Sequence, residues 1–225
     1  MVSTFIKAGL LTGLILASWL LFSLTFEGQR NNELLSDIDT IIAEESATQS
    51  YLDYLQSTGD TRRFCSVLGS HIQSQNENLF GLLQALDAAK KNSLDNQYEL
   101  VRKRFQAANA QLYFSLLTFQ RQCPNTEELQ QPVLYFFSDL EECSNCAFQA
   151  QILDELGKTC GKSIQIFAFP YEGGIEPIDL LVSDLNITRV PTLVIDENKY
   201  VGIQAPSKLS KLLGCEIKAD KNSNE

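Results

Sequence analysis

The sequence predicts an α/β domain in its C-terminal part, preceded by an all-α helical segment and an N-terminal transmembrane helix. Three observations support this prediction: an uncharged apolar run at residues 8–26, a proline-free stretch at 31–123 with apolar residues at helical spacing, and short apolar runs alternating with amphipathic stretches after Pro132. The chain has 225 residues, of which 44% are hydrophobic and 20% charged. It is therefore long enough for two small domains and apolar enough to fold around a core.

The charge balance and the single histidine exclude several classes of function. Eighteen basic and 28 acidic side chains give a net charge of −10, whereas a nucleic-acid binder would carry a basic patch. His71 is the sole histidine of the sequence and has no ligand-type partner at helical spacing. We therefore expect no nucleic-acid partner, no metal site and no Ser-His-Asp hydrolase.

The N-terminal run at 8–26 has the length of a membrane-spanning helix. Its nineteen uncharged residues would extend roughly 28 Å, close to the thickness of a bilayer core. A cleaved signal peptide is the alternative, but its apolar part is usually shorter and no A-x-A cleavage pattern follows the run. We expect an uncleaved anchor.

The orientation of this anchor follows from the charges before it and from the cysteines after it. Lys7 and the α-amino group are the positive charges on the short side, which predicts a cytoplasmic N-terminus at 1–7. The six cysteines fit an oxidising compartment for the remainder of the chain. The expected location is the cell membrane, with a single pass and extracytoplasmic C-terminal domains.

The segment at 31–123 predicts three antiparallel helices, because each of its apolar runs shows one buried face. A turn is expected at Gly59-Asp60, and another at Lys91-Asn92-Ser93. The apolar positions of the three runs are Leu34, Ile38, Ile41, Ile42, Tyr51, Leu52 and Leu55; Phe64, Leu68, Ile72, Leu79, Leu82, Leu83 and Leu86; and Tyr98, Val101, Phe105, Ala108, Leu112, Leu116 and Phe119. The segment carries no recognisable chemistry, and its role as a spacer, a dimerisation surface or a partner-docking surface stays open.

Two cysteines are placed to close the second and third helices into a hairpin. Residues equidistant from a hairpin turn face one another, and positions 65 and 123 average to 94, next to the expected turn. We therefore predict a structural Cys65–Cys123 disulfide. The alternative is two unpaired buried thiols.

The last hundred residues predict the order β-α-β-α-β-β-α. Strands are expected at 133–137, 164–169, 190–195 and 200–203, and helices after Cys146, after Pro177 and at 206–213. A turn is expected at 196–198, and the polar tail at 216–225 is expected to be disordered.

Two separated motifs in this order resemble the thioredoxin-like family. They are Cys143-Ser144-Asn145-Cys146, which follows the first strand and opens a helix, and Val190-Pro191-Thr192, which enters a hairpin strand. The similarity covers residues 131–215. It implies a membrane-anchored thiol–disulfide oxidoreductase in which Pro191 is cis and the Val190 backbone pairs with an extended substrate. Half a zinc site is the alternative for the cysteine motif, but no second pair at zinc-like spacing exists.

The cysteine motif also supports redox chemistry without the resemblance. The N-terminus of a helix stabilises a thiolate, so we expect Cys143 to attack and Cys146, one turn further on, to resolve the mixed disulfide, with no bound cofactor. Glu141 and Glu142 oppose this by disfavouring negative charge on Cys143. The sequence also departs from the family pattern, with Glu142 in place of the usual tryptophan and Phe137 in place of the buried acid.

The two remaining cysteines follow the first and last helices of the predicted α/β domain. Both helices should start at the active-site edge of the sheet and lie on one face, so their C-terminal ends should be neighbours. We predict a structural Cys160–Cys215 disulfide; a second redox pair that relays electrons is the alternative.

Two functions remain from the sequence. The first is an enzyme that exchanges disulfides with exported proteins or with a membrane redox partner through Cys143 and Cys146. The second is a non-catalytic binding or assembly scaffold in which the Cys143–Cys146 bridge is static, since a fold alone does not fix a function.

Overall fold

The computed structural model describes residues 44–91, 95–123, 130–139 and 142–215, which divide into two compact units with a boundary after Asp60. In the first unit, a helix spans residues 44–57 and is followed by the expected turn, where Gly59 has a φ of +72°. That φ lies in the left-handed region, which glycine adopts without a steric penalty.

The predicted segments 1–7, 8–26 and 216–225 lie outside the described residues, so the anchor and the disordered tail stay predictions. Among the helices that the structure does describe, none combines the length and the apolar character needed to cross a bilayer.

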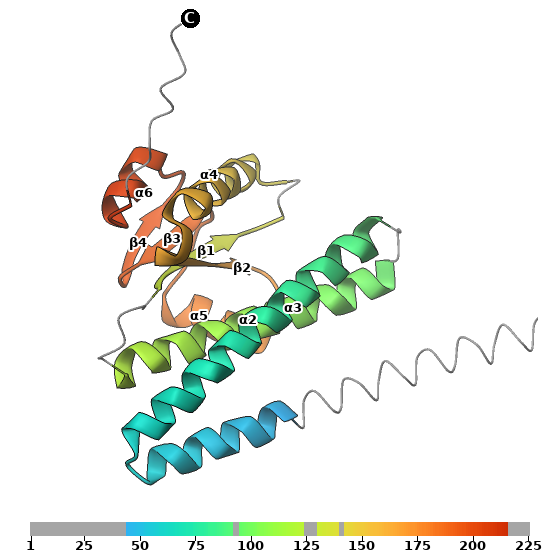
Figure 1. Ribbon diagram of the computed structural model, residues 1–225. Helices are drawn as coiled ribbons and strands as arrows, with labels where there is room; N and C mark the ends of the chain where they lie inside the picture. Colours follow the sequence, from blue (N-terminus) through green and yellow to red (C-terminus); the bar gives the residue numbers. More distant parts are fainter. Residues whose placement is uncertain (1–43, 92–94, 124–129, 140–141, 216–225) are drawn as a thin grey trace, which may run out of the picture. The chain divides into compact units, whose positions relative to one another are not determined.

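The second unit contains helices α2 to α6 and a four-stranded sheet (Figure 1). Their bounds are α2 Thr61–Lys91, α3 Asp95–Gln122, β1 Gln131–Phe137, α4 Ser144–Cys160, the short 3₁₀ helix η1 Gly161–Ser163, β2 Ile164–Pro170, α5 Glu176–Asp184, β3 Thr192–Ile195, β4 Asn198–Val201 and α6 Pro206–Leu212. The predicted order β-α-β-α-β-β-α is confirmed from β1 onward.

The sheet has the strand order β2-β1-β3-β4. β1 pairs in parallel with β2 and antiparallel with β3, and β3 forms an antiparallel hairpin with β4. Ile195 pairs with Asn198, so the hairpin loop is the two residues Asp196 and Glu197, both at positive φ. A two-residue loop of this kind fixes the register of the second strand. β4 therefore begins at Asn198 and ends at Val201, earlier than the predicted 200–203.

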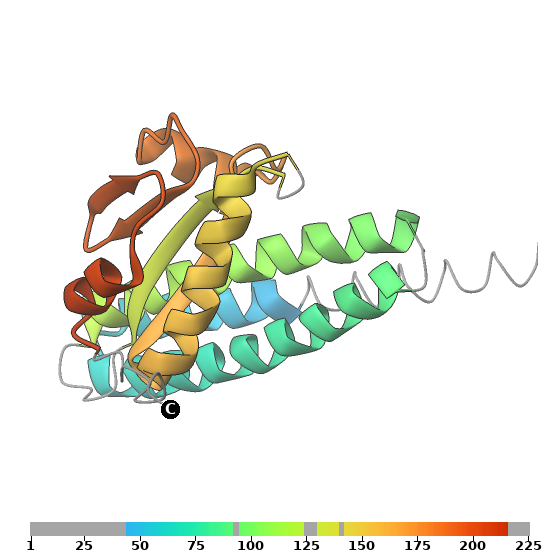
Figure 2. The ribbon, with the colours of Figure 1, turned by 90° about the horizontal axis from the view of Figure 1, so that it is seen from above.

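Helices cover both faces of the sheet. α4 and α6 pack on one face, where Leu153, Leu156 and Leu209 lie against Val133 and Leu193 of the strands. Figure 2 shows α4 running along this face, with α2 and α3 behind the strands. Because both faces are buried, β1 reads in the sequence as a continuous apolar run, as is typical of a central strand.

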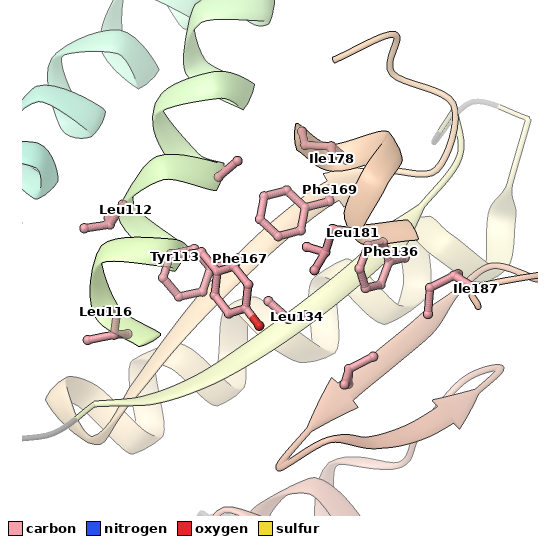
Figure 3. Packing of buried hydrophobic residues seen from close by; sticks show 12 residues of the cluster. Leu112, Tyr113, Leu116, Leu134, Phe136, Phe167, Phe169, Ile178, Leu181 and Ile187 are labelled. Atoms are coloured by element: carbon pink, nitrogen blue, oxygen red, sulfur yellow. The ribbon is translucent and has the colours of Figure 1, made fainter. Parts of the chain in front are cut away.

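The opposite face of the sheet is covered by α5 and by α3. Tyr113 of α3 meets Phe167 of β2 edge-on, with 5.3 Å between the ring centroids, and Leu116 and Ile178 belong to the same core (Figure 3). This packing places α3 in one compact unit with the sheet, so the part of the chain from Thr61 to Gln122 shares a core with the strands that follow it. The physical reason is that β2 carries large apolar side chains that need cover on this face.

Strand β2 lies at an edge of the sheet, and α3 also satisfies part of that edge. The side-chain amide of Asn109 donates a hydrogen bond of 3.0 Å to the carbonyl of Ala168, and Asn109 is 3% exposed. Edge strands with unpaired backbone groups can pair with strands of other chains. This bond therefore holds α3 against the sheet and occupies one backbone carbonyl at that edge.

Candidate functional site

The site is centred on the disulfide that joins Cys143 and Cys146 at the start of α4, with 5.2 Å between their Cα atoms. Cys143 is the N-cap residue of the helix, and its sulfur accepts a hydrogen bond of 3.1 Å from the Cys146 N–H. The first N–H groups of a helix have no intrahelical partner and carry partial positive charge. The helix therefore directs stabilising N–H dipoles at the sulfur of Cys143.

The two cysteines differ in exposure. Cys143 is half-buried and reaches solvent, whereas Cys146 is fully buried, with no exposed surface. An incoming sulfur compound can thus approach Cys143 and not Cys146. This asymmetry is the arrangement that thiol–disulfide exchange requires, with one sulfur that meets the substrate and one that resolves the intermediate.

Two backbone hydrogen bonds fix the position of Cys143 relative to the end of β1. Its N–H donates to the carbonyl of Asp139 at 2.8 Å, and the N–H of Glu142 donates to the same carbonyl at 3.2 Å. The side chains of Asp139 and Glu142 are exposed, and their negative charge acts against a thiolate at Cys143. The helix N-terminus and these carboxylates have opposite effects on the Cys143 sulfur.

Two hydroxyl groups lie beside the buried cysteine, one from strand β1 and one from the residue that follows the strand. Tyr135, 3% exposed, donates a hydrogen bond of 2.6 Å to the backbone carbonyl of Cys146, and burial raises the pKa of this tyrosine to about 12. The hydroxyl of Ser138 lies 4.0 Å from the Cys146 sulfur, and Ser138 is half-buried. Ser138 thereby links the buried sulfur to the solvent side of the loop.

The second sequence motif lies at the same edge of the sheet. The Val190–Pro191 peptide bond is cis, as the resemblance implied. Thr192 pairs with Phe136, so β3 begins beside the C-terminal end of β1, from which the chain continues to Cys143. The structure therefore brings Val190 and Pro191 to the edge that carries the cysteine pair.

The backbone of this proline segment is held by hydrogen bonds on both sides. The Pro191 carbonyl accepts a bond of 2.8 Å from the Gly202 N–H, and the Thr192 hydroxyl donates one of 2.6 Å to the Arg189 carbonyl. Pro191 is fully buried and Val190 is half-buried. The segment is thus a fixed platform and not a free loop.

The other two disulfides join Cys65 to Cys123 and Cys160 to Cys215, with Cα–Cα distances of 5.8 and 5.3 Å. The first closes the end of the α2–α3 hairpin, while the turn residues 92–94 lie outside the described residues. Cys160 ends α4, and the rise of the helix separates it from Cys146 by about 21 Å and from Cys143 by about 25 Å. Direct exchange between these two pairs within the described fold is excluded by these distances.

Sequence reasoning missed four polar residues around the site: Tyr135, Ser138, Gln149 and Gln204. Tyr135 had a signal, because a tyrosine inside a buried strand must find a partner for its hydroxyl. Gln149 had a weaker one, since it follows Cys146 by three residues and so lies on the same inward face of α4. Ser138 and Gln204 lie in loops, where spacing carries no such information.

The described residues offer no cluster of three or more histidine, cysteine, aspartate or glutamate side chains that could hold a metal ion. The edge of the sheet presents the sulfur pair, flanked by hydroxyl, amide and carboxylate groups.

Comparison with known proteins finds limited similarity. The chain matches no protein-family model and no curated protein. Among solved structures, it is similar to a malarial protein, at 22% identity over 38% of this chain and 94% of that chain, with a TM-score of 0.33. It is also similar to the oxidised thioredoxin of Plasmodium falciparum, at 21% identity over 38% of this chain and 79% of that chain, with a TM-score of 0.30.

Proposed function

We propose that the protein is a thiol–disulfide oxidoreductase that uses Cys143 as its nucleophile and Cys146 as its resolving cysteine. The observation that carries this proposal is the asymmetry of the pair: Cys143 is solvent-accessible at the N-cap of α4, and Cys146 has no exposed surface. A bridge that served stability alone would close a longer loop, because a three-residue separation removes little chain entropy.

The exchange proceeds in two balanced steps. The Cys143 thiolate attacks a substrate disulfide, forms a mixed disulfide and releases one substrate sulfur as a thiolate, which takes up a proton. The Cys146 thiol then gives up its proton and attacks the Cys143 sulfur, which re-forms the intramolecular disulfide and releases the second substrate sulfur. Two electrons pass from the cysteine pair to the substrate, and the same steps in reverse oxidise a dithiol. No bound cofactor enters either direction.

The substrate would be an extended protein segment whose backbone pairs with Val190 beside the cis proline. The half-buried Val190 and the hydrogen-bonded Pro191 carbonyl support this, because they form a fixed backbone segment directly before β3, and a peptide strand adds to backbone that is held in place. With the N-terminal run at 8–26 as its anchor, the protein would act outside the cytoplasm on exported proteins or on a membrane redox partner. The α2–α3 hairpin would then serve as a spacer or as a surface for dimerisation or docking.

The carboxylates near Cys143 favour a moderate or reducing potential. A strong oxidant needs a strongly stabilised thiolate form, and the exposed Asp139 and Glu142 destabilise that form.

The reduction potential of the Cys143–Cys146 pair in the purified protein tests the proposal, with Cys143→Ser as the control that removes the pair. A reversible potential between about −270 and −180 mV, the range of reducing and moderate oxidoreductases, is expected. A potential below about −300 mV without exchange activity would assign the protein to the alternative, a scaffold with a static bridge.

A further inference from the structure

Gln149 of α4 is a fully buried polar residue that the exchange mechanism does not use. It has no exposed surface, and its side-chain oxygen Oε1 accepts a hydrogen bond of 2.6 Å from the backbone N–H of Gln204. Its side-chain nitrogen Nε2 is also buried and has no hydrogen-bond partner among the described residues. The oxygen of this amide is therefore hydrogen-bonded, and its nitrogen is not.

The loop that Gln149 holds leads directly to the proline platform. The Gln204 side chain, 7% exposed, donates bonds of 3.1 Å to the carbonyls of both Val201 and Gly202. The Gly202 N–H in turn donates to the Pro191 carbonyl at 2.8 Å. A continuous set of hydrogen bonds thus runs from α4, three residues after Cys146, to the cis proline.

The amide of Gln149 makes a small net contribution to stability. A buried donor without a partner costs about 1–3 kcal/mol, which offsets the contribution of the one bond that Oε1 makes. An apolar side chain of similar volume would remove the unpaired Nε2, but it would leave the buried Gln204 N–H without its acceptor. A buried polar group without a partner needs an explanation. Here the explanation is that the hydrogen bond through Oε1 sets where the 201–204 loop lies relative to α4.

We propose that Gln149 is a positioning residue that fixes the substrate-binding platform at Val190–Pro191 relative to the cysteine pair. This inference rests on the proposed oxidoreductase function and deepens it. The cysteines carry the electron exchange, while Gln149 acts through Gln204 and Gly202 on the edge where a peptide backbone pairs. Its loss should therefore weaken the reaction with a peptide and leave the chemistry of the sulfur pair unchanged.

The test compares two probes on the reduced full-length protein. One is a short extended peptide whose single cysteine is linked by a disulfide to thionitrobenzoate, and the other is free cysteine linked to the same group. In single-turnover reactions, the rate of thionitrobenzoate release at increasing probe concentration gives a maximal rate and an apparent KM for each probe. The variant is Gln149→Met, which keeps the volume, and the matched control is Gln151→Met, two residues further along α4 at an exposed position. Gln204→Ala perturbs the same loop from its other side.

In Gln149→Met and Gln204→Ala, the apparent KM for the peptide probe should rise by about tenfold, which is the effect of losing one uncharged hydrogen bond to the peptide backbone. The apparent KM for the cysteine probe and the reduction potential should stay unchanged. An effect no larger than that of Gln151→Met would overturn the inference. An equal loss with both probes, or a shifted potential, would also overturn it by placing the effect on the cysteines. If the wild-type protein reacts with neither probe, the oxidoreductase proposal itself is wrong.

Discussion

Replacing Tyr135 with phenylalanine removes one buried hydroxyl from the strand beneath the cysteine pair. The side chain is 3% exposed, and its hydroxyl donates to the Cys146 carbonyl at 2.6 Å. Phenylalanine keeps the ring that stacks on Phe137, with 5.5 Å between the centroids. At neutral pH we expect a loss of about 1 kcal/mol in the free energy of unfolding, the usual net value of one hydrogen bond.

The same substitution has a second effect at alkaline pH. Burial raises the pKa of Tyr135 from 10.0 to about 12 in the folded protein, so the native state holds its proton longer than the unfolded chain. The resulting stabilisation is complete below about pH 10 and is lost as the pH rises from 10 to 12. A shift of about two units corresponds to about 2–3 kcal/mol. Tyr135→Phe should lack this loss.

Urea denaturation at pH 7, 10 and 12 measures both effects. The fall in unfolding free energy between pH 10 and 12 is measured in the wild type and in the variant, and the second value is subtracted from the first. The subtraction removes the contribution of the lysines, which titrate equally in both proteins. Tyr54→Phe is the control, since this tyrosine is 59% exposed. If Tyr135→Phe falls as steeply as the wild type, the hydroxyl is not held neutral by burial and the assigned role of Tyr135 is refuted.

Three further predictions follow from the fold and the site. Replacing Cys65 and Cys123 together with alanine should lower the free energy of unfolding by about 4 kcal/mol, because their separation of 58 residues sets the loop entropy; a change below about 1 kcal/mol in urea denaturation would contradict this. Asn109→Ala should cost about 2 kcal/mol through the unpaired carbonyl at the edge of β2, and a stability equal to wild type by thermal unfolding would refute that contact. Ser138→Ala should slow the resolution of a trapped mixed disulfide by about tenfold, because its hydroxyl lies 4.0 Å from the Cys146 sulfur, which must lose its proton in that step; Ser138→Thr should restore the rate, and equal stopped-flow rates in all three proteins would contradict this role.

The sequence predicts much of this architecture because the relevant signals are local. β1 shows an apolar run, α5 and α6 have proline in their first turns, and the cysteine motif lies where a strand gives way to a helix. The pairing of Cys65 with Cys123 follows from hairpin symmetry alone, and the structure contains this disulfide. Such features depend on spacing within one or two neighbouring elements.

The remaining features depend on contacts between distant segments. The apolar stripe of α3 predicts a helix with one buried face, but not that Tyr113 packs on Phe167 of β2. The bond between Gln149 and Gln204 joins residues 55 positions apart, through a loop whose path is set by the preceding hairpin. No periodicity in either segment encodes that distance, so the support of the proline platform becomes visible only in the folded chain.

Trapping of the mixed disulfide tests the central claim most directly. The reduced Cys146→Ser and Cys143→Ser proteins are each mixed with the thionitrobenzoate-linked peptide, quenched with acid and analysed by mass spectrometry. We expect Cys146→Ser to accumulate a covalent adduct of the peptide at Cys143, because the nucleophile remains and the resolving thiol is gone, and Cys143→Ser to form almost none. An adduct that forms faster on Cys146, or on neither cysteine, would contradict the assignment of Cys143 as the attacking residue.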